Sequence, residues 1–167
     1  MTPRELFERY KEDIYRTCYY MLQNQQDAED VCQEVFIQAI KHDYQRIEKL
    51  KPWLLSMTMN ACRNALKKRN RLALWNWTKT WIQPNQSETN VLQSEVRSEL
   101  SHVLQELPEK IRSIVILRYY HDMKHEEIAE ALGIPVGTVK SRCHKAHQTL
   151  QGKVKVQKLA EEWGILP

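Results

Sequence analysis

Apolar residues recur at spacings of three and four over most of the chain, and this period is typical of amphipathic helices. The first helix is predicted to begin after Thr2, with Pro3 in its first turn and Glu5 reaching back to the cap. The polar stretch QNQQ (23–26) ends this helix. Its expected buried stripe consists of Phe7, Tyr10, Ile14, Cys18 and Met21.

Two further helices are predicted in the first half of the chain. One begins near Asp27 and has a broad apolar face. The next begins at Pro52 and continues to about Arg71. The expected buried positions are Ala28, Val31, Cys32, Val35, Phe36, Ala39 and Ile40 in the former, and Leu54, Met57, Ala61 and Ala65 in the latter.

Residues 73–93 break the helical pattern, and Pro84 with its polar neighbours favours an irregular segment. We interpret this stretch as a flexible linker. It contains Trp75, Trp77 and Trp81, which either pack on a flanking domain or form a docking segment for a partner. The sequence supports both interpretations of these tryptophans.

Helical periodicity resumes in the second half of the chain. It predicts helices before and after Pro108, over EEIAEAL (126–132), and from about Val136 to Lys155. No strand-like alternation stands out. The sequence therefore predicts an all-α chain with two small helical domains, the second containing a helix-turn-helix. The expected ranges are 1–72 and 94–155 for the domains, 73–93 for the linker and 156–167 for a C-terminal tail.

The stretch EEIAEALGIPVGTVKSRCHKA (126–146) has the layout of that helix-turn-helix. Gly133 suits the left-handed residue that ends the first helix, and Ala129 is small enough for close helix approach. One side of the second helix is apolar, with Val139, Cys143, Ala146 and Leu150. The other side offers donors for a DNA major groove, namely Thr138, Ser141, Arg142 and Lys145, with Lys140 and His144 at its margins. A solvated charged face is the simpler alternative, but the turn and the small packing residue favour DNA binding.

Charge is segregated along the chain, although the formal net charge is only +4. Residues 17–40 contain no Lys or Arg, and their acids are Asp27, Glu29, Asp30 and Glu34. Residues 63–71 contain five basic residues and no acid. This segregation predicts two surfaces for two partners. The acids either stabilise the start of their helix through its dipole or attract a basic protein partner.

The basic residues of the third predicted helix share one stripe with two amides. The stripe spans about 16 Å at a rise of 1.5 Å per residue, and Trp53 lies near it. Cations that can bind phosphates, beside an aromatic ring that can stack on a base, suit a single strand of nucleic acid. The residues alone support this interpretation and a plain solvated face equally. The members of the stripe are Asn60, Arg63, Asn64, Lys67 and Arg71.

Several classes of function find no support in the residues. The four cysteines form no CxxC pair and no His or Asn completes a ligand pattern with the acids, so we expect no metal site and no cofactor. No nucleophile–base or phosphate-loop constellation occurs, so we do not expect the protein to be an enzyme. We accordingly expect no catalytic residue and no small-molecule substrate. The charged N-terminus lacks a signal-peptide core, and no apolar run of about 18 residues exists. These features predict a cytoplasmic protein.

The ordered motifs resemble those of bacterial RNA polymerase sigma factors of the extracytoplasmic-function (ECF) type, in the sigma-70 family. The resemblance covers about Leu6 to Gln151 and implies a promoter-specificity subunit that binds core RNA polymerase and promoter DNA and performs no chemistry itself. The motifs are DAEDVCQEVFIQA (27–39), PWLLSMTMNACRNALKKRNR (52–71), ELPEKIRSIVILRYY (106–120) and the helix-turn-helix stretch 126–146.

The resemblance also implies roles for individual residues. Polymerase binding falls on Asp27, Asp30, Gln33 and Glu34. Opening of the −10 promoter element and capture of its bases fall on Trp53, Asn60, Arg63, Asn64 and Lys67, with Arg71 at the end of the same stripe. Recognition of the −35 element falls on Thr138, Lys140, Ser141, Arg142 and Lys145.

Two further expectations come from the resemblance. The first is an inhibitory partner, an anti-sigma factor that is commonly anchored in the membrane and holds the two domains closed. The second concerns a departure, because Lys124 stands where the family often has a capping Ser, and Asp122 is then the expected cap. The alternative to a sigma factor is an autonomous helix-turn-helix regulator that binds duplex DNA without polymerase. That alternative leaves the acidic second helix and the basic third helix unexplained.

Overall fold

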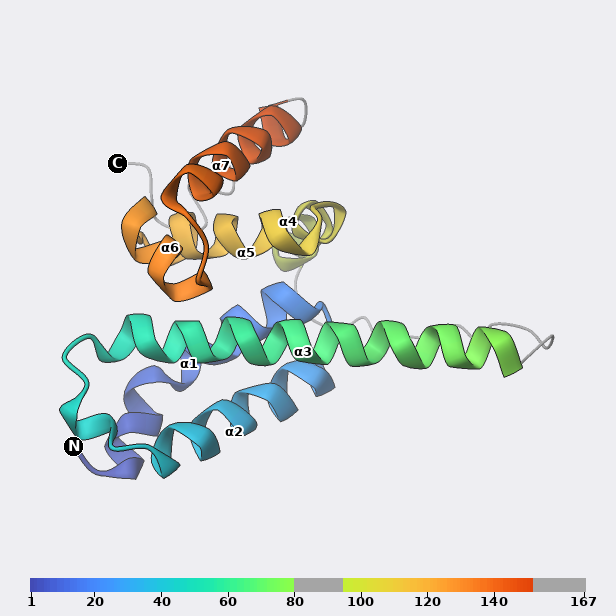
Figure 1. Cartoon of the computed structure of the whole chain (residues 1–167). Helices are drawn as coiled ribbons and strands as arrows, with labels where there is room; N and C mark the ends of the chain where they lie inside the picture. The colour runs from blue at the N-terminus through green and yellow to red at the C-terminus, as the bar shows by residue number, and fades with distance from the viewer. Residues whose placement is uncertain (80–94, 152–167) are drawn as a thin grey trace.

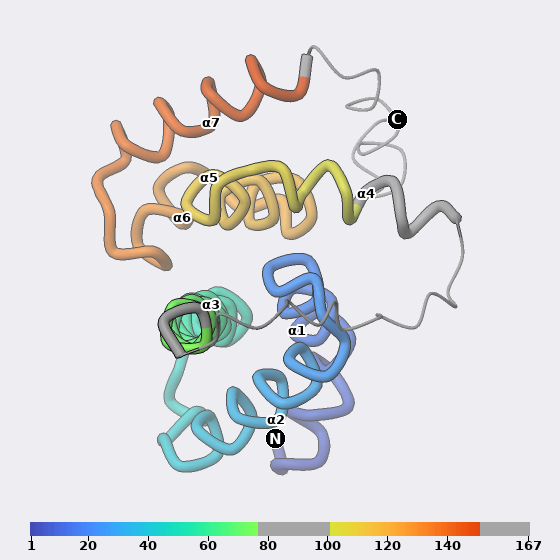
Figure 2. The backbone as a smooth tube through the Cα atoms, turned by 90° about the vertical axis from the view of Figure 1, so that its right-hand side faces the viewer, coloured from blue at the N-terminus to red at the C-terminus, as the bar shows by residue number. Residues whose placement is uncertain are grey.

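Helices in two groups make up the part of the chain that the computed structural model describes, residues 1–79 and 95–151. The two groups face one another, with α1 and α3 of the first lying against α5 and α6 of the second (Figures 1 and 2). This arrangement confirms the all-α prediction. The first group is α1 (Pro3–Leu22), α2 (Gln25–Lys41), the 3-10 turn η1 (Tyr44–Arg46) and α3 (Leu50–Lys79). The second is α4 (Glu95–Glu106), α5 (Glu109–Val115), the π-helical turn η2 (Ile116–Tyr120), α6 (His125–Leu132) and α7 (Val136–Gln151).

Side chains fix the starts of α1 and α2. The Thr2 hydroxyl accepts the Glu5 amide at 3.2 Å and the Glu5 carboxylate accepts the Thr2 amide at 2.8 Å, which confirms the predicted capping box. The side-chain carbonyl of Asn24 accepts the Asp27 amide at 2.8 Å. Because Asn24 takes this capping position, α2 begins earlier than the sequence pattern indicated.

Two predicted core residues lie at the rim of the first group instead. Phe7 is 40% exposed, and its ring meets Phe36 edge-on at 5.0 Å, whereas the adjacent Leu6 takes the interior position. Ile40 is also exposed. The other expected positions of α2, and Ile14, Cys18 and Met21 of α1, are buried as predicted.

The register and the length of α3 differ from the prediction. Met57, Ala61 and Ala65 are only partly buried, because α3 packs against α1 and α2 on one side and against α6 on another. The helix also continues to Lys79, so the first residues of the expected linker are helical, and Trp75 lies there 58% exposed. The buried residues of α3 among those with described side chains are Leu54, Leu55, Thr58, Met59 and Cys62. The side chain of Trp77, Trp81, the rest of the linker, the end of the last predicted helix at Lys155 and the tail lie outside the described residues.

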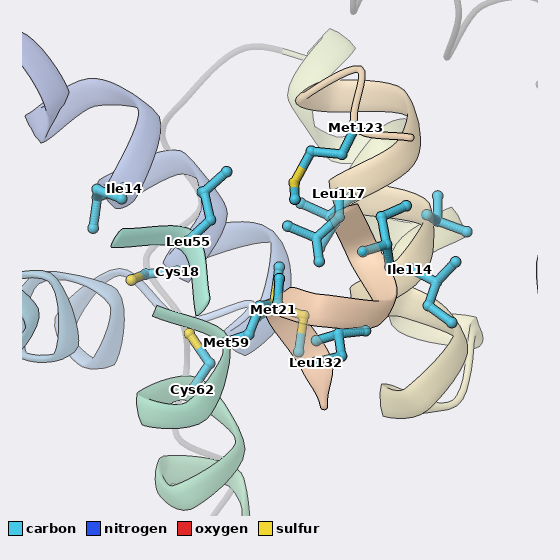
Figure 3. Packing of buried hydrophobic residues seen from close by; sticks show 14 of the residues in the cluster. Ile14, Cys18, Met21, Leu55, Met59, Cys62, Ile114, Leu117, Met123 and Leu132 are labelled. Atoms are coloured by element: carbon cyan, nitrogen blue, oxygen red, sulfur yellow. The ribbon is translucent and has the colours of Figure 1, made fainter. Parts of the chain in front are cut away.

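One apolar core extends through both groups. Met21, Leu55 and Met59 of the first group and Leu117 and Leu132 of the second belong to a single cluster of buried residues (Figure 3). The two groups are therefore joined by packing as well as by the chain.

The helix-turn-helix has the predicted geometry. Gly133 ends α6 in the left-handed region at φ +64°, and the Ile134 amide donates to the Ala129 carbonyl at 3.1 Å. The predicted cap of α6 is wrong: Lys124 holds the cap position and donates its amide to the Glu127 carboxylate at 2.8 Å. Asp122 lies in the preceding turn at φ 50°. The expected inner positions Ile128, Ala129, Leu132, Val139, Cys143, Ala146 and Leu150 are all buried.

Candidate nucleic-acid and polymerase interfaces

The basic stripe on α3 is accessible except at one residue. Asn60, Asn64, Lys67 and Arg71 are exposed. Arg63 is half-buried and donates from Nε to the Glu109 carboxylate of α5 at 3.4 Å. The structure therefore places the middle of the predicted single-strand surface against the second group of helices.

Trp53 lies in a groove of about 530 Å³ between the two groups. The same groove is lined by Arg46 and Lys49 on the side of the first group and by Glu127 and Glu130 of α6. The indole ring meets His42 edge-on at 6.0 Å and is partly buried. An aromatic face with nearby cations suits an unstacked base, and carboxylates from α6 line the same space.

The polar side of α7 presents the residues predicted to read duplex DNA. Lys140, Ser141 and Lys145 are exposed, and Thr138 and Arg142 are half-exposed. They lie opposite the buried apolar side that packs on the rest of the helix-turn-helix. The Ser141 hydroxyl donates to the Thr138 carbonyl at 3.0 Å, so it bonds back to the backbone of its own helix in this arrangement. Arg and Lys side chains on an outward helix side are suited to base edges and phosphates.

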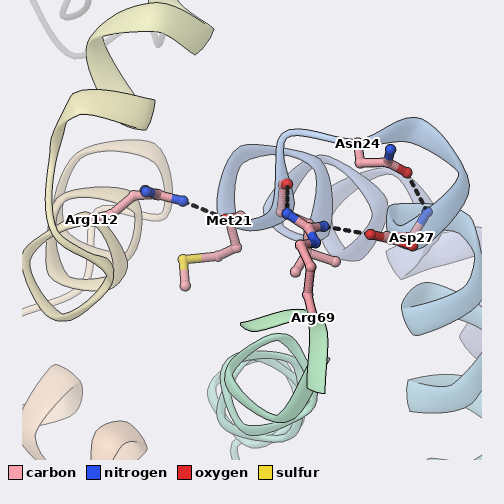
Figure 4. A network of polar contacts seen from close by, with 6 residues as sticks. Met21, Asn24, Asp27, Arg69 and Arg112 are labelled. Carbon is pink, nitrogen blue, oxygen red and sulfur yellow. Dashed lines mark hydrogen bonds and ion pairs between the residues drawn. The ribbon is translucent and has the colours of Figure 1, made fainter. Parts of the chain in front are cut away.

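The acidic face of α2 divides into two parts. Asp30, Gln33 and Glu34 are exposed. Asp27 is instead paired with Arg69 of α3, which also donates to the Leu22 carbonyl at 3.0 Å (Figure 4). The structure thus brings three of the four predicted polymerase contacts onto one free face and gives the fourth an internal partner.

Sequence reasoning missed apolar residues beside this acidic face. Ile37 is 54% exposed on α2, and Ile40 and Phe7 are exposed as well. Large exposed apolar side chains next to polar ones are typical of a protein-binding surface. The apolar periodicity assigned Ile40 to the core, because periodicity within one helix does not show where the helices packed against it end.

Arg69 and Arg112 were also missed, and both bind the carboxyl end of α1. Arg112 donates to the Met21 carbonyl at 2.6 Å (Figure 4). It also donates to the Leu107 carbonyl at 3.0 Å. Burial lowers the pKa of Arg112. The last turn of α1 contains no basic residue of its own. Because the carbonyls at the end of a helix attract positive charge, this absence is a sequence signal that side chains of other helices supply the cations.

The cysteines are buried free thiols, as the sequence indicated. A hydrogen bond with Cys62, followed by burial, raises the pKa of Cys18, and burial raises that of Cys32 to about 11. Such thiols are poor nucleophiles at neutral pH. Within the described ranges, no group of three or more His, Cys, Asp or Glu side chains is placed to hold a metal ion.

Comparisons with known proteins identify the family to which this chain belongs. Residues 6–72 match the family model Sigma-70 region 2, and residues 97–150 match Sigma-70, region 4. The chain belongs to the sigma-70 family. It is a polymerase-binding sigma factor, and sigma factors are regulatory rather than catalytic proteins.

Several relatives of this sigma factor are named as ECF sigma factors. It is 28% identical to the ECF RNA polymerase sigma factor SigW of Bacillus subtilis over 90% of this chain and 88% of that protein. It is 29% identical to the RNA polymerase sigma factor SigV of the same organism, over 82% of this chain and 81% of that protein. Within residues 1–79 and 95–151, no helix has both the length and the apolar content needed to cross a membrane.

Two solved structures have a similar fold. The sigma factor RpoE from Bartonella quintana, in complex with the anti-sigma factor NepR, aligns with a TM-score of 0.71 and 22% identity, over 92% of this chain and 96% of that chain. CnrH, in complex with the cytosolic domain of CnrY, aligns with a TM-score of 0.61 and 20% identity, over 90% of this chain and 85% of that chain.

Proposed function

We propose that the two domains of this sigma factor divide promoter recognition between them. The first, residues 1–72, opens the −10 element with the α3 stripe and Trp53. The second, residues 94–155, reads the −35 element with the polar side of α7. The observation that carries the proposal is the pair of basic, outward-facing helix sides, one beside an aromatic groove and one in a helix-turn-helix.

Core polymerase binds through the free part of the α2 face in this proposal. Asp30, Gln33 and Glu34 provide its polar contacts, and Ile37 adds an apolar one. Protein interfaces typically combine apolar contacts with polar ones. Asp27 supports this face indirectly through its ion pair with Arg69.

The compartment and the inhibitor follow from this role. The chain acts in the cytoplasm, where polymerase and promoter DNA are found. An anti-sigma factor, anchored in the membrane, is its proposed inhibitor. One similar solved fold was determined in complex with the anti-sigma factor NepR and the other with the cytosolic domain of CnrY, which supports an inhibitory protein partner.

Transcription in vitro on paired templates tests the division of labour. Each promoter from an enriched library is prepared as a full duplex and with its −10 region already unpaired. Core polymerase with the chain should initiate on both templates. Arg142→Ala should reduce initiation on both by about 5- to 150-fold, the value of one bidentate base contact. Lys67→Ala should reduce initiation mainly on the full duplex.

The control for both variants is Arg4→Ala, which removes an exposed cation from the first turn of α1. It should leave initiation unchanged on either template. Tight and specific duplex binding by the chain alone, with no stimulation of core polymerase, would contradict the proposal and favour the autonomous regulator.

A further inference from the structure

The end of α3 projects beyond the other helices of the described residues (Figure 1). This end carries Trp75, whose side chain is 58% exposed. The match to Sigma-70 region 2 covers residues 6–72, so Trp75 lies beyond the part of α3 that the family model describes. At this exposure the ring is not part of the buried core, and its role is to be sought on the surface of the helix.

Trp75 continues the side of α3 that carries the basic stripe. Residues three, four and seven apart lie on the same side of an α-helix. Trp75 follows Arg71 by four residues, and Arg71 follows Lys67 by four. At the other end, Trp53 precedes Asn60 by seven residues. The opposite side of the helix faces the core, with Leu54, Leu55, Thr58, Met59 and Cys62.

The stripe therefore has a tryptophan near each end and polar side chains between them. Trp53 and Trp75 are separated by about 33 Å along the helix axis, at a rise of 1.5 Å per residue. Exposed Lys67 and Arg71 lie between the two rings, together with two exposed amides. Bases stack on aromatic rings, and cations bind the phosphates between them. At 3.4 Å per nucleotide, a stacked strand of about ten nucleotides covers this length.

The junction of the two domains leaves the Trp75 end of the stripe clear. At this junction the Ser56 hydroxyl donates to the Ala131 carbonyl of α6 at 2.7 Å, and Arg63 pairs with Glu109 of α5. Arg63 precedes Trp75 by about 18 Å along the helix axis. Trp75 is consequently on a part of α3 that is accessible while the two domains are docked.

The surroundings of Trp75 favour a nucleic acid over an apolar partner. From residue 63 to residue 79, α3 contains six basic residues and no acid. Leu72 and Leu74 are also exposed, but Leu74 is turned by about 100° from Trp75 and by about 200° from Leu72. The three side chains do not form the single apolar side that a membrane surface or a partner helix needs.

We propose that Trp75 is a second base-stacking site for single-stranded nucleic acid, at the opposite end of the stripe from Trp53. The proposal rests on the proposed function, because it takes the stripe to be the single-strand surface. A bound strand contacts a ring near each end, and its phosphates meet Lys67 and Arg71 between the rings. The second site lengthens the strand that α3 can hold.

Binding of labelled oligothymidylates of about 12 and about 4 nucleotides to the full chain tests this assignment. Trp75→Ala should weaken binding of the longer oligonucleotide by about 5- to 150-fold, the effect of losing one stacked base. Trp75→Phe should retain most of the affinity, because a ring remains. The shorter oligonucleotide should lose less affinity in Trp75→Ala, because it cannot span both rings and can bind beside Trp53.

The control is Leu72→Ala, which removes an apolar side chain of similar exposure, 52%, at a position turned by about 100° from Arg71. It should leave both affinities unchanged. Because Leu72 and Trp75 are exposed, the thermal unfolding midpoint should be the same in all the variants. Equal affinities of Trp75→Ala and Leu72→Ala for the longer oligonucleotide would overturn the proposal. A loss that Trp75→Phe does not restore would overturn it as well.

Photo-cross-linking of the unaltered chain provides a second, independent measurement. The longer oligonucleotide is prepared with 5-bromouracil at one end or at the other, irradiated in the complex, and the cross-linked residue is identified by mass spectrometry. One of the two oligonucleotides should cross-link to Trp75 and the other near Trp53. The absence of a cross-link at Trp75 from both oligonucleotides would contradict the second site.

Failure of the proposed function has a different outcome. In that case Lys67→Ala leaves the binding of both oligonucleotides unchanged. If α3 binds the strand but Trp75 takes no part, Lys67→Ala weakens binding and Trp75→Ala does not.

Discussion

Gly133 occupies a backbone conformation that other residues adopt only with strain. Its φ is +64°, and a Cβ at this position would meet no atom within 4 Å. Gly133→Ala should therefore lower the free energy of unfolding by about 1 kcal/mol through backbone strain alone. Gly137→Ala, in the first turn of α7, is the control and should be neutral or raise it by up to about 1 kcal/mol. Urea unfolding of both variants measures the difference, and equal losses would contradict the assignment.

His121 is a partly buried, neutral base at the junction of the domains. Thr17 donates its hydroxyl hydrogen to the Asp13 carbonyl at 2.7 Å, so its oxygen accepts from Nε2 of His121, also at 2.7 Å. Burial and the charge of Lys51 together lower the pKa of His121 to about 4, although Asp13 acts in the opposite direction. Tyr120 also packs on the ring, with the ring centroids 4.6 Å apart.

The stability of the chain should consequently depend on pH through His121. The unfolded chain binds a proton here near pH 6.5, before the folded chain does, so this group lowers stability as the pH falls from about 6.5 to about 4. Between pH 7.5 and 5.5 the loss should be on the order of 1 kcal/mol greater in the unaltered chain than in His121→Gln. Urea unfolding at both pH values measures it. The exposed control His144→Gln should behave like the unaltered chain.

The carboxyl end of α1 depends on cations from other elements. Arg69→Gln removes the donor to the Leu22 carbonyl and the ion pair with Asp27. The expected loss is about 1 kcal/mol of unfolding free energy. Lys68→Gln removes a neighbouring exposed cation and should cost much less. The thermal unfolding midpoints of the two variants measure this difference. Two equal midpoints would exclude a role for Arg69 in capping α1.

The acids of α2 should separate into two functions when they are tested individually. Asp27→Asn should reduce thermal stability and leave core-polymerase affinity nearly unchanged, because Asp27 is paired with Arg69. Glu34→Gln should do the opposite, since Glu34 is exposed. Polymerase affinity measured alongside the unfolding midpoint distinguishes them. An equal loss of affinity in both variants would show that Asp27 meets the polymerase directly.

Spacing alone predicted the helices of the first group and the helix-turn-helix, but it did not predict how far α3 extends. The break in apolar periodicity after Arg71 indicated a linker, yet the helix continues to Lys79. Backbone hydrogen bonding continues through Leu72, Leu74 and Trp75, whose side chains are exposed. The predicted buried side of α3 was wrong at Met57, Ala61 and Ala65 for a related reason. A helix that packs between two layers buries residues on more than one side.

At the scale of the whole molecule, the junction was beyond the sequence pattern. Periodicity shows that Met21 and Met59 are apolar and inward-facing, but not that their neighbours come from the other domain. Arg63 was predicted from its basic stripe, and its pairing with Glu109 depends on how two separately predicted domains dock. Contacts between distant segments depend on tertiary packing, which local spacing does not record.

The shared core also predicts how the described part of the molecule unfolds. Because one apolar cluster spans both groups, the unaltered chain should unfold in a single cooperative transition. Ala131→Gln weakens the junction and should separate the transition into two or lower its calorimetric cooperativity. Glu126→Gln should retain the single transition. Calorimetry checks this, and two transitions in the unaltered chain would contradict it.

The covalent connection between the domains changes how the junction responds to dilution. A separate inhibitor releases its target when both become scarce, because association between two molecules weakens as concentration falls. Closure within one chain is unimolecular, so its extent is the same at nanomolar and at millimolar protein. A sigma factor closed by its own α5 and α6 would stay equally closed in a cell that contains very few copies. Its opening would then be set by the concentration of polymerase and DNA, and not by its own.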